Sequence, residues 1–303
     1  MHIVVTGGAG FIGAHSSRAL LAAGHRVTAV DDLSHGKREA VPEGVALEVQ
    51  DVRAPDLQHL FARLRPDAVL HLAAQMDVRK SVADPTFDAS VNVLGTVNVL
   101  EAAQRAGVKR LVFASSGGAV YGEQESFPAA ESHPRAPASP YGVSKLCGEE
   151  YLSLYARNGL CCLALRYANV YGPGQDPHGE AGVVAIFANK MLAGAQPVVN
   201  GDGGQTRDYV HVEDVARANV LALQSTAQGA LNVGTGRETS VNVLAAALAR
   251  ELGFLQPIVN GPAKAGEQRR SVVSPARALA VLGWAPRIEL AQGLAATAAW
   301  FRR

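Results

Sequence analysis

Cysteine is scarce in this chain of 303 residues. The three cysteines, Cys147, Cys161 and Cys162, are odd in number and include an adjacent pair. They fit neither a disulfide framework nor the paired spacing of a zinc site. We therefore expect a reduced, cytoplasmic protein.

The chain also lacks an excess of charge of one sign, since it has 28 Lys and Arg residues and 27 Asp and Glu residues. This balance gives no reason to expect nucleic acid or a membrane surface as a partner. No apolar run reaches the roughly 18 residues that indicate a membrane span. The first five residues already read as a strand, so we expect no signal peptide. The nine histidines form no HExxH or HxxxH pair, and we expect no metal site.

Short runs rich in Val, Ile and Leu alternate with amphipathic stretches through the first half of the chain. The runs predict buried strands at 2–6, 26–31, 46–50, 68–72, 110–114 and 161–167. The stretches predict helices at 13–23, 56–64, 87–106 and 140–158. Such alternation predicts an α/β fold with a doubly wound parallel sheet.

After residue 171 the composition shifts toward turns and polar loops, notably at 171–177 and 196–207. Helical patterns remain at 183–193, 212–224 and 241–252. We expect a smaller C-terminal lobe that binds the substrate and consists of 171–206 and 241–303. The sheet domain would then comprise 1–170, with a return near 207–240.

A glycine-rich segment, Gly8-Ala9-Gly10-Phe11-Ile12-Gly13, directly follows the first predicted strand and leads into a helix. In this context G-x-G-x-x-G lets the backbone approach a pyrophosphate at the helix N-terminus. Asp31 ends the next strand, where a carboxylate can accept hydrogen bonds from the adenosine ribose. Together with Asp32 it would repel a 2′-phosphate, so we expect a Rossmann domain that binds NAD rather than NADP. The alternative is a glycine turn that binds no nucleotide.

Two further strand ends would face the same cofactor. Asp51 and Val52 follow the third strand and could hold the adenine edge, and the segment Leu72-Ala73-Ala74 follows the fourth. Small side chains in that segment would let the backbone run past the cofactor. Otherwise these are ordinary strand-end residues.

A phenol and an ammonium group stand one helical turn apart at Tyr141 and Lys145. A cation so close favours the phenolate, which can act as a general base near neutral pH. Taken alone, the pair could equally be a surface contact. Ser115 and Ser116 follow the fifth predicted strand at the carboxyl edge of the sheet, where α/β proteins bind ligands. The combination of these features favours an active site.

With these motifs the chain resembles the extended short-chain dehydrogenase/reductase family, and within it the UDP-galactose 4-epimerases. The resemblance rests on these segments: Thr6-Gly7-Gly8-Ala9-Gly10-Phe11-Ile12-Gly13, His71-Leu72-Ala73-Ala74, Ser115-Ser116, Val120-Tyr121-Gly122, Ser139-Pro140-Tyr141-Gly142-Val143-Ser144-Lys145, Leu165-Arg166-Tyr167-Ala168-Asn169, Arg207-Asp208-Tyr209-Val210-His211-Val212 and Leu282-Gly283-Trp284.

The resemblance implies a catalytic base, Tyr141, its electrostatic partner, Lys145, and a serine, Ser116. The chain has one residue more between this serine and Val120-Tyr121-Gly122 than those epimerases, so Ser115 is the alternative. The implied cofactor contacts are Gly7, Gly10, Phe11, Ile12, Asp31, Asp32, Ser34, Gly36, Asp51, Val52, Leu72, Ala73, Ala74, Gln75, Tyr141, Lys145 and Ala168.

The resemblance also implies substrate contacts. They are Ser116, Tyr141, Asn169, Val183, Val198, Asn200, Arg207, Lys264, Glu267 and Ser271. Asn169 and Arg207 would grip the nucleotide diphosphate, because a guanidinium can bind phosphate oxygens with two parallel hydrogen bonds. Lys264 and Glu267 replace the Arg and Asp of a family Arg-x-Gly-Asp segment. Ser271 stands where a bulky tyrosine accompanies plain hexoses and a small residue accompanies N-acetylated sugars.

The implied reaction is transient oxidation of a UDP-hexose at C4: Tyr141 takes the hydroxyl proton, hydride passes to NAD and returns to the opposite face. A 4,6-dehydratase would carry an Asp-Glu pair where Gly117-Gly118 stands. The motifs are also compatible with a UDP-glucuronate epimerase or decarboxylase and, less readily, with a non-enzymatic NAD-binding regulator. The resemblance also implies a homodimer packed through the helices at 87–106 and 140–158.

Overall fold

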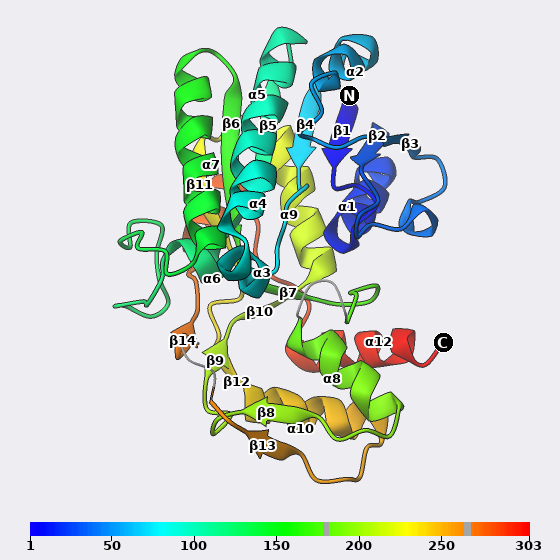
Figure 1. The fold of residues 1–303 in the computed structure, drawn as a ribbon, viewed down its shortest axis with the longest axis vertical. Coiled ribbons are helices and arrows are strands. Elements are labelled where there is room, and N and C mark those ends of the chain that lie inside the picture. The colour runs from blue at the N-terminus through cyan, green and yellow to red at the C-terminus, as the bar shows by residue number, and fades with distance from the viewer. Residues whose placement is uncertain (178–181, 264–267) are drawn as a thin grey trace.

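A 7-stranded parallel sheet forms the centre of the computed structural model, which describes residues 1–177, 182–263 and 268–303. Its strands run in the order β11-β6-β5-β4-β1-β2-β3 (Figure 1). They are β1 (His2–Thr6), β2 (Arg26–Asp31), β3 (Ala46–Val49), β4 (Ala68–His71), β5 (Arg110–Ser116), β6 (Cys161–Tyr167) and β11 (Gly229–Val233). The predicted doubly wound sheet is confirmed. Only β11, at the edge, has no counterpart among the predicted strands.

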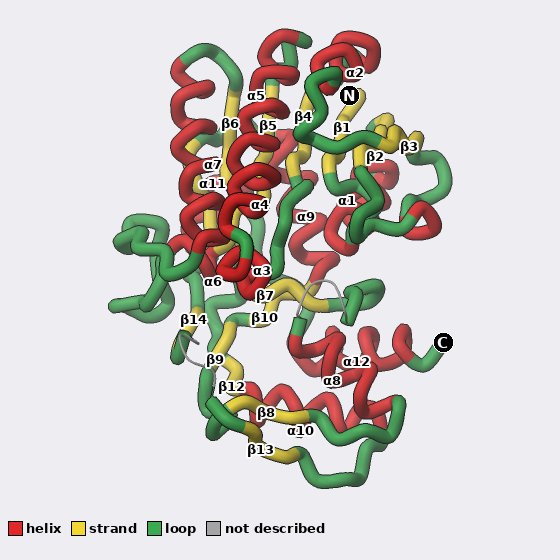
Figure 2. Tube along the Cα trace, viewed as in Figure 1, coloured by secondary structure: helices red, strands yellow, loops and turns green. Residues whose placement is uncertain are grey.

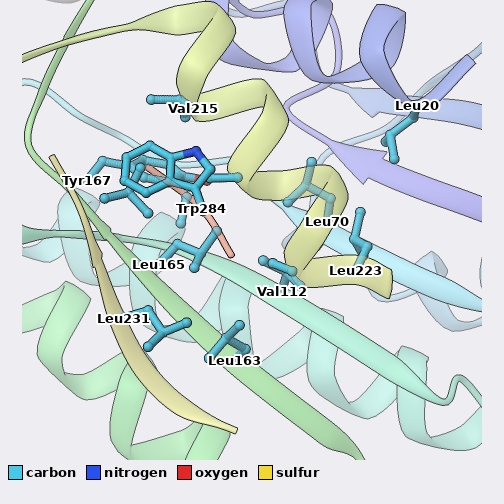
Figure 3. Packing of buried hydrophobic residues seen from close by; sticks show 14 of the residues in the cluster. Leu20, Leu70, Val112, Leu163, Leu165, Tyr167, Val215, Leu223, Leu231 and Trp284 are labelled. Carbon is cyan, nitrogen blue, oxygen red and sulfur yellow. The ribbon is translucent and has the colours of Figure 1, made fainter. Parts of the chain in front are cut away.

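Helices cover both faces of the sheet because side chains alternate along each strand. Ile3 and Val5 point into one apolar cluster, and Val4 points into the other. The first face carries α1 (Phe11–Ala22), α9 (Val212–Gln224) and α11 (Ala276–Leu282). The second carries α2 (Leu57–Leu64), α5 (Gly95–Arg105) and α7 (Pro140–Arg157). Figure 3 shows the first cluster, where Trp284 lies among Tyr167, Leu165 and Val215.

The helix predicted at 87–106 is interrupted. The chain runs through α4 (Pro85–Ala89), a π-helical turn, η2 (Ser90–Leu94), and then α5. Shorter helices stand nearby and at the sheet edge, namely η1 (Arg38–Ala40), α3 (Val78–Ala83) and α6 (Gly117–Val120). Such π-helical turns are rare and frequently mark functional sites.

A second, smaller lobe lies beyond the carboxyl ends of the strands (Figure 1). Its described residues form α8 (Val183–Leu192), α10 (Val241–Leu252), α12 (Leu290–Phe301), β8 (Val198–Asn200) and β13 (Val259–Gly261). Short strands join the two lobes (Figure 2): β7 (Asn169–Tyr171), β9 (Thr206–Arg207), β10 (Tyr209–His211), β12 (Thr239–Ser240) and β14 (Arg270–Ser271).

The chain returns to the sheet twice. The first return, with α9 and β11, falls within the predicted 207–240. The second brings α11 and Trp284 onto the sheet core, although 241–303 was assigned to the small lobe. Within the described residues, no helix combines the length and apolarity that crossing a membrane requires.

Candidate active site

The glycine-rich loop packs against the end of β4. Gly7 has a φ of +69°, and a Cβ there would stand 2.7 Å from the main-chain nitrogen of Ala73. The helix α1 begins at Phe11, two residues before the predicted start. Its N-cap is Gly10, which has no side chain to cap the helix, and its first turn is uncharged. The free amide groups at such an N-terminus suit a phosphate.

Asp31 anchors this loop from the end of β2. Its Oδ2 accepts a hydrogen bond of 3.0 Å from the amide of Ala9, and its Oδ1 accepts one of 2.9 Å from the amide of Leu33. Burial raises the pKa of Asp31. Each oxygen keeps a lone pair that can accept from a ribose hydroxyl. The neighbouring Asp32 is exposed and accepts hydrogen bonds from the amide and hydroxyl of Ser34. The loop therefore fits a dinucleotide.

Two predicted cofactor residues use their polar groups within the protein. Asp51 accepts several hydrogen bonds from Arg53, which lower the pKa of Asp51. The Gln75 amide bonds to both main-chain groups of Asp77 and to Asp88. These hydrogen bonds of Gln75 favour a role in fixing the loop that follows β4. The remaining predicted contacts lie along the strand ends: Gly36 beside Asp31, Val52 against Gly95, Leu72 to Ala74 after β4, and Ala168 beside Gly234.

Tyr141 and Lys145 lie in the first two turns of α7, whose N-cap Ser139 accepts a hydrogen bond of 3.1 Å from the amide of Gly142. Lys145 is buried, and its Nζ donates a hydrogen bond of 2.9 Å to the main-chain oxygen of Ala114. The Nζ lies 5.7 Å from the centre of the Tyr141 ring. Burial lowers the pKa of Lys145 to about 8, and the charge of Asp88 opposes this shift.

The two serines at the end of β5 have different surroundings. Ser115 is buried and donates a hydrogen bond of 2.5 Å to Glu149, which forms a buried ion pair of 2.6 Å with Arg166. Ser116 is the last residue of β5 and the N-cap of α6, and it is half-buried.

Three predicted side chains converge on Gly118. A Cβ built there would stand 3.7 Å from the Oγ of Ser271, 4.0 Å from the Oδ1 of Asn169 and 4.0 Å from the Oγ of Ser116. Ser271 is buried, although a surface loop position was the alternative. The structure thus brings the side chains of Ser116, Asn169 and Ser271 together around Gly118.

The other predicted substrate residues follow the short strands. Ser271 pairs in register with Arg207 in neighbouring strands, and the amide of Asn169 donates a hydrogen bond of 2.9 Å to the main-chain oxygen of Asp208. Val183 begins α8, and Val198 and Asn200 lie in β8. Lys264 and Glu267 lie outside the described residues.

Two buried carboxylates of this region, Asp208 and Asp88, were not predicted from the sequence. Asp208 accepts hydrogen bonds from the amide and hydroxyl of Thr235 and from the amide of Gly236, and burial raises the pKa of Asp208. Asp88 lies between α7 and the π-helical turn. The only sequence signal for Asp88 is its place on the apolar side of a predicted helix. Periodicity alone does not show whether a charged residue at such a place is buried.

Residues 3–234 match the NAD dependent epimerase/dehydratase family. The UDP-glucose 4-epimerase of Mycolicibacterium smegmatis is 47% identical over 310 residues, covering 100% of this chain and 99% of that protein. The crystal structure of the Thermotoga maritima UDP-glucose 4-epimerase with UDP-glucose has a TM-score of 0.97 at 44% identity. That of the Thermus thermophilus UDP-glucose 4-epimerase with NAD has a TM-score of 0.95 at 46% identity. Each comparison covers 100% of this chain and 99% of the other.

Proposed function

The chain belongs to the NAD-dependent epimerase/dehydratase family, and we propose that it interconverts UDP-glucose and UDP-galactose as a UDP-hexose 4-epimerase with bound NAD. It is similar over its whole length to enzymes named UDP-glucose 4-epimerase. The observation that carries the proposal is the burial of Lys145 beside Tyr141, at the strand edge where Ser116, Asn169 and Ser271 converge.

The roles of the side chains follow from their positions. Tyr141 takes the proton of the sugar C4 hydroxyl, because the Lys145 cation stabilises the phenolate. Ser116 donates a hydrogen bond to the same oxygen and holds it in place. NAD, when bound along the glycine-rich loop and Asp31, would supply the hydride acceptor and donor for C4. Tyr141 then gives the proton back, so that neither proton nor hydride is lost over the cycle.

The diphosphate and uridine would lie across the short strands between the lobes. Arg207 and Asn169 are proposed to hold the phosphates, since Arg207 pairs in register with Ser271 and Asn169 lies with Ser271 and Ser116 around Gly118. The predicted Val183, Val198 and Asn200 would line the nucleotide side, together with Lys264 and Glu267.

A dehydratase is less well supported on chemical grounds. Water loss needs an acid and a base near C5 and C6, and that place in the chain carries Gly117-Gly118. The atoms within 4 Å of a Cβ built on Gly118 belong to serine and asparagine side chains. These groups do not titrate near neutral pH, so they suit positioning more than elimination.

The test is to incubate the purified protein with UDP-galactose and to follow UDP-glucose by chromatography or a coupled dehydrogenase. A panel of other UDP- and dTDP-sugars serves as comparison. We expect C4 epimers of UDP-hexoses without added reductant. A 4-keto-6-deoxy product, or no turnover of any hexose, would contradict the proposal.

We also propose a homodimer packed through α7 and the α4 to α5 region, which contact each other along their length. This face carries exposed apolar side chains on neighbouring elements, namely Val82, Leu94, Val143 and Leu154. An apolar hollow lies beside them, lined by Pro85, Thr86, Ala89, Ser90, Val93 and Leu94. Sedimentation analysis of the wild type and Leu94→Glu tests the proposal, since a charge in the contact should favour the monomer.

A cytoplasmic location is proposed from the thiols. Cys147, Cys161 and Cys162 are all free, as expected of a protein kept in a reducing compartment. Cell fractionation with an antibody against the protein tests this.

A further inference from the structure

Asp88 is a buried carboxylate that ties three segments together. Its Oδ1 accepts hydrogen bonds of 2.9 Å from the Gln75 amide and 2.9 Å from the Asn92 amide. Its Oδ2 accepts one of 2.7 Å from the hydroxyl of Ser144. These donors belong to the loop after β4, to the π-helical turn η2 and to α7. Asp88 is only 1% exposed, so its three neutral donors replace nearly all of its hydration.

A buried carboxylate with only neutral donors is costly to keep unless a cation lies near. Among the described residues, Asp88 takes part in no ion pair within 4.0 Å. Lys145 follows Ser144, the hydrogen-bond donor to Asp88, directly in the chain, and the charge of Asp88 opposes the lowering of the Lys145 pKa by burial. Lys145 has a neutral hydrogen-bond acceptor, the main-chain oxygen of Ala114.

The other titratable groups around Lys145 are either neutral or paired with another charge, so Asp88 is the counter-charge of Lys145. His71 on β4 is buried, and burial together with the Lys145 charge lowers its pKa to about 3, so it is neutral. Glu149, one turn further along α7, is paired with Arg166 of β6. Tyr141 is the reacting phenol. The face of β5 offers the ring of Phe113, 4.8 Å from the Nζ of Lys145.

We propose that Asp88 is a positioning residue that keeps the ammonium of Lys145 protonated and holds α7 against the cofactor loop. The inference rests on the proposed function, since Lys145 matters there as the cation beside Tyr141. The working form of the pair is the phenolate with the ammonium, and it exists only below the pKa at which Lys145 loses its proton. An anion nearby raises that pKa. Removing the anion therefore moves the loss of activity to lower pH.

The experiment measures kcat/KM for UDP-galactose against pH in the wild type and in Asp88→Asn, which keeps the shape and removes the charge. We expect the alkaline limb to move down by about one pH unit, a typical effect of one neighbouring charge. On that limb the rate then falls about tenfold relative to the wild type, with a smaller change near neutral pH. A purely structural defect would lower kcat/KM by one factor at every pH.

Two control variants separate charge from packing. Asp84→Asn removes a carboxylate from the exposed N-cap of the same helix, where the amide of Phe87 is its partner. Ser144→Ala removes a hydrogen bond to Asp88 but keeps the charge. Both should leave the alkaline limb in place. If Asp88→Asn does not fold, as judged by circular dichroism, Asp88→Ser is a second neutral replacement.

A measurement that does not depend on turnover tests the role of Asp88 separately from the proposed function. NMR titration of carbon-labelled lysine side chains, with Lys145→Arg to assign the signal, reports the protonation of Lys145 directly. We expect the midpoint to fall in the folded neutral variant even if another sugar is the substrate. An unchanged midpoint, a uniform loss of rate across pH, or the same shift in Ser144→Ala would overturn the proposal. Failure of the wild type to epimerise any hexose would overturn the function alone.

Discussion

The hydroxyl of Ser115 donates a hydrogen bond of 2.5 Å to the carboxylate of Glu149. This contact faces the core, because Glu149 also receives two hydrogen bonds from the Arg166 guanidinium. Ser116, the next residue, lies instead beside the atoms that surround Gly118. Because side chains alternate along β5, Ser115 points into the core and Ser116 points toward Gly118, where Asn169 and Ser271 also lie.

We therefore predict that Ser116→Ala lowers kcat by about 10²-fold, the usual cost of losing one donor to a reacting oxygen. Ser115→Ala, its matched control, should retain most of the activity and lose about 1 kcal/mol of unfolding free energy. Steady-state kinetics and urea unfolding of both variants provide the measurement. The reverse order of the two kcat effects would assign the role to Ser115.

Tyr141→Phe keeps the ring and removes the oxygen that we propose takes the proton. Since general acid–base catalysis contributes roughly 10²–10⁴-fold, turnover should fall by at least that order. NAD affinity, measured by calorimetry, should change little because the glycine loop and Asp31 are untouched. Near-normal epimerisation by this variant would mean that another group is the base.

The sequence predicts the sheet well because buried parallel strands are continuous apolar runs. The strand limits at 2–6, 26–31 and 161–167 agree with the structure. It does not predict β11, whose Gly-Ala-Leu-Asn-Val has few large apolar side chains, nor the return of Trp284 to the sheet core. Both depend on contacts between residues far apart in the chain, which local periodicity does not contain.

The candidate site likewise contains features that the sequence predicts and features that it does not. Motif spacing places Tyr141 and Lys145 on one helix face, and strand ends place Ser116 and Asp31 at one edge of the sheet. The role of Asp88 needs a π-helical turn that carries Asn92 to the same carboxylate. No residue pattern in the sequence marks this turn, which lies between α4 and α5 and packs against α7.

Asp31 should decide which dinucleotide binds. Because its carboxylate is fixed by the amides of Ala9 and Leu33, a 2′-phosphate would meet a held negative charge. We expect NAD to bind at least tenfold more tightly than NADP, a difference of about 1.4 kcal/mol. Asp31→Ala should weaken NAD binding, while Asp32→Asn, on the exposed neighbour, should change it little. Equal affinities of the wild type for NAD and NADP would contradict this prediction.

Ser271 should set the width of the sugar pocket. It is buried, and its Oγ lies 3.7 Å from a Cβ built on Gly118, next to Ser116 and Asn169. Serine at this position leaves open the space that a phenol ring would fill. We therefore predict that the wild type turns over UDP-N-acetylgalactosamine as well as UDP-galactose.

Ser271→Tyr tests this prediction, because the added ring competes with an acetamido group for the same volume. We expect kcat/KM for UDP-N-acetylgalactosamine to fall at least tenfold more than that for UDP-galactose. Ser271→Ala is the control, since it removes the hydroxyl and keeps the space, and it should retain both activities. If the wild type rejects the acetylated sugar, or if tyrosine lowers both rates equally, the pocket is limited elsewhere and Ser271 does not set its width.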